Sequence, residues 1–277
     1  MLKGIDVSNW QGTIDWDAVK ADGISFAIAK ATEGTNFVDP FFARNWSEMK
    51  RVGIMRGAYH YARPALNAAN SEADFFYGAV SAQGIEKGDI LVLDMEEHDS
   101  DACGWALFWL EHLDDTTPYR PMLYTSPSYI AKYEMAENPP FFGYPLWLAS
   151  WGAIFPDPPD TFWPVDIWQS ASDGKVAGIR GNVDIDWYDG SEEEFKQLSQ
   201  QDEPPEDDDP WGEHDEANEH TFAVMPTLTW VSNSLEEMLA HCVDVALVDP
   251  DENQRREAAR LWAREFLDRR PTWDKDG

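Results

Sequence analysis

The chain has 277 residues, 43% of them hydrophobic, and a formal net charge of −31 at pH 7. This length is enough for one large domain or for a medium domain and a small one, and the hydrophobic share suffices for a buried core. The charge argues against nucleic acid and anionic membranes as direct partners, because both would be repelled at long range.

We expect neither a secretory signal nor a membrane-spanning helix. Strand-like sequence begins at the fourth residue of "MLKGIDVSNW", which leaves no room for a charged segment followed by an apolar one. No run approaches the roughly 18 apolar residues of a membrane span. The two cysteines, Cys103 and Cys242, are too few and too far apart for a disulfide framework, so we expect both to be reduced.

Short apolar runs rich in strand-forming residues recur along the first 190 residues, each bounded by turn residues or by a helical pattern. The runs predict eight strands, at residues 4–8, 25–30, 56–61, 90–96, 121–126, 145–150, 165–170 and 182–188.

The connections between these strands differ in the two halves of the chain. In the first half, apolar residues at helical spacing follow Asp, Asn or Ser. They predict helices at residues 15–23, 39–53, 67–84 and 100–115, with a short helix after Ser126. In the second half, residues 151–164 are proline-rich, and residues 171–181 carry the glycines and the Asp-Gly pair of a hairpin.

Eight strands with crossover helices predict an α/β protein, an irregular (β/α) barrel with few helices in its second half. The competing architecture is an open doubly wound sheet. It is disfavoured because no Gly-rich phosphate-binding turn follows the first strand.

The composition divides the chain into three parts. Residues 1–190 form the predicted barrel. Residues 191–220 read as an acidic linker, since thirteen acids and one base lie between Glu192 and Glu219. Residues 221–277 carry two helical patterns and predict a small C-terminal helical module.

Acidic residues stand at the ends of three predicted strands. Asp94 and Glu96 are two residues apart at the end of the fourth strand, so their side chains share a face. Asp6 ends the first strand, and Asp184 and Asp186 lie on the last one. The first and last strands become neighbours when a barrel closes. These carboxylates are therefore expected at one mouth, the end at which barrel enzymes place their chemistry.

Aromatic and polar side chains on the remaining strands are expected to line the same mouth, with Glu33 at its rim. They are Tyr59, Tyr61, Tyr124, Trp147 and Gln169. For the aromatic residues, packing in the core is an equal alternative, as a structural role is for Glu33. For His60 a structural role is favoured.

A ring of carboxylates with an aromatic lining suits glycoside hydrolysis. One carboxylic acid protonates the leaving oxygen, and a second carboxylate stabilises or attacks the sugar. Crowding of like charges keeps one acid protonated. The alternatives are a solvated acidic loop and a divalent-metal site.

Six segments resemble successive blocks of glycoside hydrolase family 25, the Chalaropsis-type lysozymes that are often phage endolysins. The segments are "GIDVSNWQGTIDW" (4–16), "FAIAKATEG" (26–34), "GAYHYARP" (57–64), "LVLDMEE" (91–97), "PLWLASW" (145–151) and "IWQSASDGKVAGIRGNVDIDWY" (167–188).

The resemblance implies a muramidase that cuts the β-1,4 bond between N-acetylmuramic acid and N-acetylglucosamine in peptidoglycan, without cofactor or metal. Glu96 matches the general acid and Asp94 its partner. Asp6 and Asp184 match the remaining active-site carboxylates, and Asp186 a less constant position. In the family net retention is favoured, through a carboxylate nucleophile or through the N-acetyl group of the substrate, whereas a wider separation of the two carboxylates would suit an attacking water.

By analogy with endolysins, the protein is expected in the host cytoplasm until a holin lesion releases it to the cell wall. The C-terminal module is then expected to bind wall or to self-associate. A different class of function is a non-catalytic wall-binding or virion structural protein on the same barrel. A chitinase-like hydrolase is a third reading, which "ILVLDMEE" disfavours because it lacks the additional upstream acids of that motif.

Overall fold

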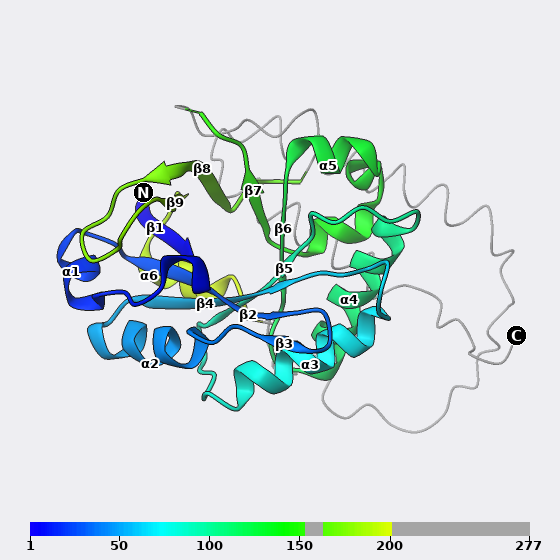
Figure 1. Cartoon of the computed structure of the whole chain (residues 1–277). Coiled ribbons are helices and arrows are strands. Elements are labelled where there is room, and N and C mark those ends of the chain that lie inside the picture. The colour runs from blue at the N-terminus through cyan, green and yellow to red at the C-terminus, as the bar shows by residue number, and fades with distance from the viewer. Residues whose placement is uncertain (153–162, 201–277) are drawn as a thin grey trace, which may run out of the picture. The chain divides into compact units, whose positions relative to one another are not determined.

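The computed structural model describes residues 1–152 and 163–200, in which eight strands close into a barrel (Figure 1). The barrel strands are β1 (Leu2–Val7), β2 (Phe26–Glu33), β4 (Met55–Tyr61), β5 (Ile90–Asp94), β6 (Met122–Thr125), β7 (Leu146–Ala149), β8 (Ile167–Gly174) and β9 (Val183–Tyr188). Strand β1 pairs with β2 on one side and with β9 on the other, and this closes the barrel. The predicted fold is confirmed.

One strand of the barrel runs against its neighbours. Strands β1, β2 and β4 to β8 are parallel, whereas β9 is antiparallel to both β8 and β1. The connection over residues 175–182 is too short for a parallel crossover, which needs a dozen residues or more. The short strand β3 (Phe37–Val38) pairs with β2 outside the barrel and was not predicted.

Helices lie around the outside of the strands in the first half of the chain, as predicted (Figure 1). They are α1 (Trp16–Ala21), α2 (Phe42–Val52), α3 (Ala69–Ser81), α4 (Ala102–Thr116) and α5 (Pro127–Lys132). Asp15 and Ser126 cap the N-termini of α1 and α5 through their side chains. The short 3-10 helices are η1 (Asn9–Gln11), η2 (Met135–Glu137) and η3 (Pro139–Gly143).

Two hydrophobic cores explain the continuous apolar runs of the strands. Alternate side chains such as Phe26 and Ile28 fill the barrel interior, while Ala27 and Ala29 between them face the helices. A strand that is buried on both faces has apolar residues at successive positions, whereas a half-exposed strand alternates apolar and polar residues. The apolar packing occupies the floor of the barrel and leaves its other end to polar groups.

The ordered barrel extends beyond the predicted boundary at residue 190. Helix α6 (Glu192–Gln197) follows β9, and its Phe195 is fully buried against Phe26 and Tyr188 at the barrel floor. The acidic composition marked this segment as linker, but Phe195 and Leu198 pack it onto the core inside the barrel. The predicted linker beyond residue 200 and the predicted module at 221–277 lie outside the described residues.

Two further sequence-based expectations concern cysteines and membranes. Cys103 is a free thiol, and Cys242 lies outside the described residues. Within residues 1–152 and 163–200, every helix is too short or too polar to cross a membrane.

Candidate active site

A pocket of about 310 Å³ lies at the mouth of the barrel, beyond the C-terminal ends of the parallel strands. Its walls contain most of the residues that the sequence singled out. They are Asp6, Ser8, Trp10, Lys30, Tyr59, Tyr61, Asp94, Glu96, Tyr124, Trp147, Trp151, Gln169 and Asp184.

Strand alternation brings these side chains together. On β5, Ile90 and Val92 point into the barrel core, and Asp94 is the next residue on that face. On β2, Phe26 and Ile28 are likewise followed by Lys30. Each strand therefore has an apolar lower part and a polar end, and the polar ends form the pocket.

Asp94 and Glu96 form an acidic pair on one side of the pocket. Asp94 is buried, and its Oδ1 has no hydrogen-bond partner in the described part of the chain. Burial and then the charge of Glu96 raise the pKa of Asp94 well above its ordinary value. Burial also raises the pKa of Glu96, opposed by the nearby Tyr124 hydroxyl. The pair therefore keeps a proton to higher pH than two isolated carboxyl groups would.

A second acidic group faces the first. Asp6 on β1 lies directly opposite Asp184 on β9 in the strand register. Burial raises the pKa of Asp184 to about 6, and the charge of Glu96 adds to the effect. Burial and the charges of Asp186 and Asp184 raise the pKa of Asp6. Strands β1, β5 and β9 thus contribute Asp6, Asp94 and Asp184 to one pocket.

A hydrogen-bonded chain fixes the position of Asp6. The Gln169 amide donates from Nε2 to Oδ2 of Asp6 at 2.8 Å. Its Oε1 accepts hydrogen bonds from the Tyr124 hydroxyl at 3.1 Å and from Nε1 of Trp151 at 3.3 Å. Gln169 therefore connects these three residues, and it also lines the pocket, so its contact with substrate stays a prediction.

Asp186 does not line the pocket, contrary to our expectation of a substrate contact. It is fully buried and accepts a 2.9 Å hydrogen bond from Nε1 of Trp147. Residues two apart on a strand are separated by about 6.6 Å along it, so Asp186 lies one layer below Asp184. Burial, opposed by the Trp147 hydrogen bond, raises the pKa of Asp186.

Glu33 is also absent from the pocket lining and belongs to an ion network at the rim. It pairs with Lys30 at 2.6 Å and with Arg63 at 2.6 Å, and Arg63 also pairs with Glu97. Two cations neutralise Glu33, and the net effect holds its pKa below the ordinary value despite burial. Its carboxylate is bound by two cations of the protein, and a contact with substrate at the rim stays a prediction.

His60 has the structural role that we favoured. Its ring is fully buried and hydrogen-bonds Thr32 at 2.8 Å and Glu72 at 2.7 Å. Burial lowers its pKa, and the Glu72 carboxylate opposes this. It therefore ties β2, β4 and α3 together behind the pocket.

Sequence reasoning missed Trp10, Lys30 and Trp151 as pocket residues. Trp10 is 88% exposed in η1, and Trp151 is 68% exposed just after β7. Exposed indoles beside a pocket are a signal for ligand contact that the sequence alone does not give. Lys30 is the one cation among the pocket-lining residues of the described ranges, and its ammonium lies 4.8 Å from the ring centre of Tyr61.

The chemistry available to this pocket is proton transfer and stabilisation of positive charge. In the part of the chain that the structure describes, no cluster of three or more His, Cys, Asp or Glu side chains could hold a metal ion. A protonated carboxylic acid, ionised carboxylates opposite it and aromatic walls are the groups that cleavage of a glycosidic bond requires.

Comparison with known proteins supplies the family. The sequence profile of glycosyl hydrolases family 25 matches residues 5–179. The chain belongs to this family. Lysozyme M1 of Streptomyces globisporus is 36% identical over 203 residues, which are 69% of this chain and 68% of that protein.

Solved structures of family 25 members share the fold. The lysozyme from Streptomyces coelicolor superposes with a TM-score of 0.62 at 32% identity and covers 72% of this chain and 96% of its own. The CTP1L endolysin superposes with a TM-score of 0.60 at 29% identity, covering 71% of this chain and 68% of its own. This family 25 protein is a glycoside hydrolase of the lysozyme type, and peptidoglycan is its substrate.

Proposed function

We propose that this enzyme is an N-acetylmuramidase that hydrolyses the β-1,4 bond between N-acetylmuramic acid and N-acetylglucosamine. The observation that carries the proposal is the gathering of Asp6, Asp94, Glu96 and Asp184 around one aromatic-walled pocket in a family 25 barrel. Peptidoglycan offers the pocket sugar rings for its indoles and phenols and a glycosidic oxygen for its acid.

In this proposal Glu96 is the general acid. Burial raises its pKa, so it holds a proton that it donates to the leaving oxygen as the glycosidic bond breaks. Asp94, Asp6 and Asp184 face the sugar carbon that becomes positive and stabilise that charge. Water supplies the hydroxyl of the new reducing end, and Glu96 recovers its proton from that water.

The deciding experiment identifies the new reducing sugar. Purified walls are digested, the products are reduced with borohydride, and the reduced residue is identified by mass spectrometry. Reduced N-acetylmuramic acid supports the proposal, and reduced N-acetylglucosamine or no new reducing end contradicts it. Glu96→Gln is expected to lower kcat by about 10²–10⁴-fold, whereas Glu137→Gln, on an exposed carboxylate in η2, keeps full activity.

The competing function is a non-catalytic wall-binding or virion structural protein on the same barrel. Such a protein would bind walls and release no reducing ends. The complete set of carboxylates in the pocket favours the enzyme, because burying several acids together lowers stability and is retained where chemistry uses it.

We further propose that the enzyme acts as an endolysin, held in the host cytoplasm until a holin or similar lesion gives it access to the wall. The likeness to the CTP1L endolysin supports this role. Cells expressing the enzyme should stay intact until their membrane is permeabilised and then lyse. Appearance of the enzyme in the medium of intact cells would contradict the proposed release.

For residues 221–277 we propose wall anchoring, with self-association as the competing role. Wall pelleting of the full chain carrying Glu96→Gln, compared with a chain ending at residue 200, separates the two. Anchoring predicts that only the full chain pellets at high yield. Light scattering that shows an oligomer of the full chain and a monomer of the shorter one, with equal pelleting, would favour self-association.

A further inference from the structure

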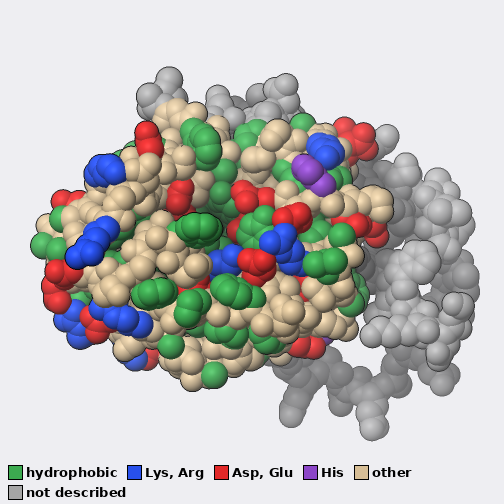
Figure 2. All heavy atoms as spheres, in the orientation of Figure 1, with side chains coloured by type: hydrophobic (Ala, Val, Ile, Leu, Met, Phe, Trp, Pro, Cys, Tyr) green, Lys and Arg blue, Asp and Glu red, His purple; other side chains and the backbone are tan. Residues whose placement is uncertain are grey.

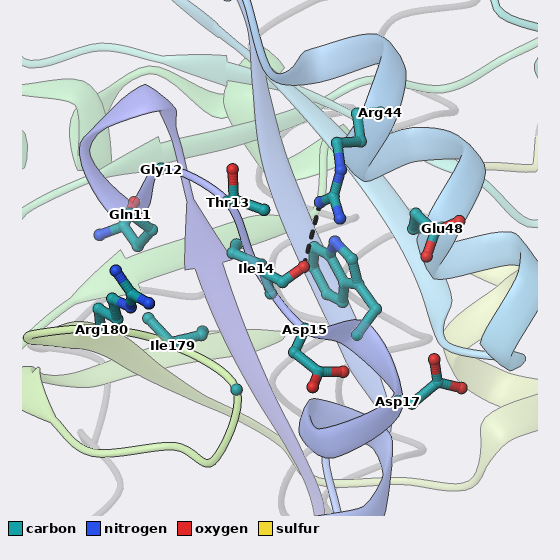
Figure 3. Close-up of a pocket in the computed structure, with 12 residues that line it drawn as sticks. Gln11, Gly12, Thr13, Ile14, Asp15, Asp17, Arg44, Glu48, Ile179 and Arg180 are labelled. Carbon is teal, nitrogen blue, oxygen red and sulfur yellow. Dashed lines mark hydrogen bonds between the residues drawn. The ribbon is translucent and has the colours of Figure 1, made fainter.

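A second and larger cavity, of about 760 Å³, lies on the outer wall of the barrel beside the active site (Figure 3). It is bounded by the segment that leads from η1 into α1, by one side of α2, and by the loop between β8 and β9. Its described lining includes Gln11, Thr13, Ile14, Arg44, Glu48 and Arg180.

Two arginines stand on different elements around this cavity. Arg44 comes from α2 and Arg180 from the β8–β9 loop, and Figure 3 shows them on opposite sides of residues 12–15. Arg44 donates from Nη1 to the Ile14 carbonyl at 3.1 Å. Neither arginine forms a salt bridge with a residue of the described ranges.

The acids of the same cavity already have partners. Arg51 holds Asp17 with two hydrogen bonds, at 3.0 and 2.6 Å, and also holds Glu48. Asp15 accepts the Ala18 amide as the N-cap of α1. Among the charged side chains of this cavity in the described ranges, the two guanidinium groups are therefore the cations without an ionic partner, and Arg44 keeps only its hydrogen bond to the Ile14 carbonyl.

Backbone contacts fix the two walls relative to each other. The Asp15 amide donates to the Gly178 carbonyl at 3.0 Å, so the β8–β9 loop is attached to the start of α1. Gly178 has a φ of +90°, and a Cβ there would lie 2.3 Å from the Asp15 carbonyl oxygen. A glycine is thus required for this close approach, and the loop that carries Arg180 is held in place before any ligand binds.

The cavity adjoins the active site through a shared wall. Ser8 and Trp10 line the catalytic pocket, and Gln11 and Gly12, which follow them directly, line the second cavity. Figure 2 shows Lys and Arg side chains, with Asp and Glu side chains among them, along the edge of the molecule where α1 and α2 lie. A polymer bound at the barrel mouth can extend across η1 toward this edge.

We infer that Arg44 and Arg180 form an accessory site for a carboxylate on the peptide attached to the glycan strand. This inference rests on the proposed function. The planar guanidinium fork matches a carboxylate with two parallel hydrogen bonds. The peptides of peptidoglycan end in carboxylates and project from the sugars, whereas removal of a peptide frees a carboxylate on the lactyl group, which is attached directly to the sugar. The site gives an enzyme of high negative charge a favourable contact with an anionic polymer.

The test compares two substrates that differ in the peptide and in the lactyl carboxylate that its removal frees beside the sugar ring. Glycan strands free of phosphate polymers are used before and after an amidase removes their peptides. Arg44→Gln with Arg180→Gln is expected to lower kcat/KM on the peptide-bearing strands about five- to tenfold, as expected for two exposed charge-assisted contacts. The same double variant should match the wild type on stripped strands. The loss should shrink as ionic strength rises.

Two further variants make the test selective. Lys87→Gln with Lys132→Gln removes the same charge from exposed positions away from the cavity and should leave both substrates unaffected. Arg180→Gln alone leaves the Arg44 contact to Ile14 intact, so it should reproduce part of the loss without altering the fold.

Each remaining outcome counts against the accessory site. An equal loss of kcat/KM on both substrates would show that the arginines act on glycan binding or on the fold. Wild-type kcat/KM on both substrates would show that the arginines do not contact the substrate. If phosphate-bearing wall polymers restore a difference that peptides do not, the anion is a phosphate and the carboxylate assignment fails. If the wild type cleaves neither substrate, it is the proposed muramidase function that fails.

Discussion

Gln169 donates a 2.8 Å hydrogen bond to Asp6, and both side chains are buried in the wall of the active-site pocket. The same amide accepts hydrogen bonds from Tyr124 and Trp151, so one neutral side chain connects an acid, a phenol and an exposed indole. An amide is suited to this position because it both donates and accepts.

Gln169→Leu should therefore destabilise the fold and the site together. The substitution keeps the volume but leaves a buried Asp6 oxygen and the Tyr124 hydroxyl without their partner, which costs about 1–3 kcal/mol for an unsatisfied group. Urea unfolding should show this loss, and activity should fall with it. Gln83→Leu, at an exposed position after α3, is the control. Equal unfolding midpoints for both variants would contradict the connecting role.

The buried carboxylates predict that the fold is more stable in mild acid than at neutral pH. The pKa of Asp184 is raised to about 6, above the unfolded value of about 3.9. The folded chain therefore binds more protons between these values. The contribution of Asp184 is fully present below about pH 3.9 and is lost as the pH rises through about 6.

Unfolding in urea at pH 4.5 and pH 7 measures this effect. The wild type should lose more stability than Asp184→Asn on going to pH 7, because the amide has no proton to release. Asp189→Asn, on an exposed residue after β9, should follow the wild type. Parallel losses in the wild type and Asp184→Asn would contradict the assignment.

Lys30→Met should shift the pH dependence of hydrolysis to higher pH. Lys30 is 13% exposed, lines the pocket, and lowers the pKa values of both Asp94 and Glu96. Removing its charge raises both pKa values, so both limbs of the profile of kcat/KM against pH move upward. Lys30→Arg should restore the wild-type profile. A lower rate with unshifted limbs in Lys30→Met would assign Lys30 to packing alone.

Trp10→Ala should weaken substrate binding without changing stability. The indole is 88% exposed beside the pocket, so little apolar area is lost on truncation. Loss of a stacking surface for sugar should raise KM about tenfold, which corresponds to roughly 1.4 kcal/mol of binding free energy. Phe108→Ala, at a 53% exposed position on α4, is the control. An unchanged KM would remove Trp10 from the binding site.

The barrel could be predicted from the sequence because the central strands, such as β2 and β5, are buried on both faces over most of their length. Eight apolar runs with turn residues between them are compatible with few folds other than a barrel, and all eight runs form strands. The meeting of Asp6 and Asp184 followed from closure alone, since the first and last strands of a barrel must pair. The antiparallel direction of β9 does not disturb this meeting, because register places the two residues opposite each other.

The depth of each side chain could not be predicted. Alternation assigns Asp184 and Asp186 to the same face, but their level along the barrel axis depends on strand tilt and on the bulges in β8. The ion pair of Glu33 with Arg63 could not be predicted for a related reason, because Arg63 reaches Glu33 from the end of a neighbouring strand. Such contacts arise from side-chain reach across strands, which residue spacing does not encode.

The pairing of β1 with β9 also has a kinetic consequence. Gln169 and Asp6 are 163 residues apart in sequence, and their hydrogen bond exists only after both ends of the barrel have met. Contacts of such long separation form late, since the entropy of loop closure opposes them. A ribosome-bound chain that has not released β9 therefore lacks Asp184 in its site, and newly made enzyme becomes competent only after β9 has paired with β1.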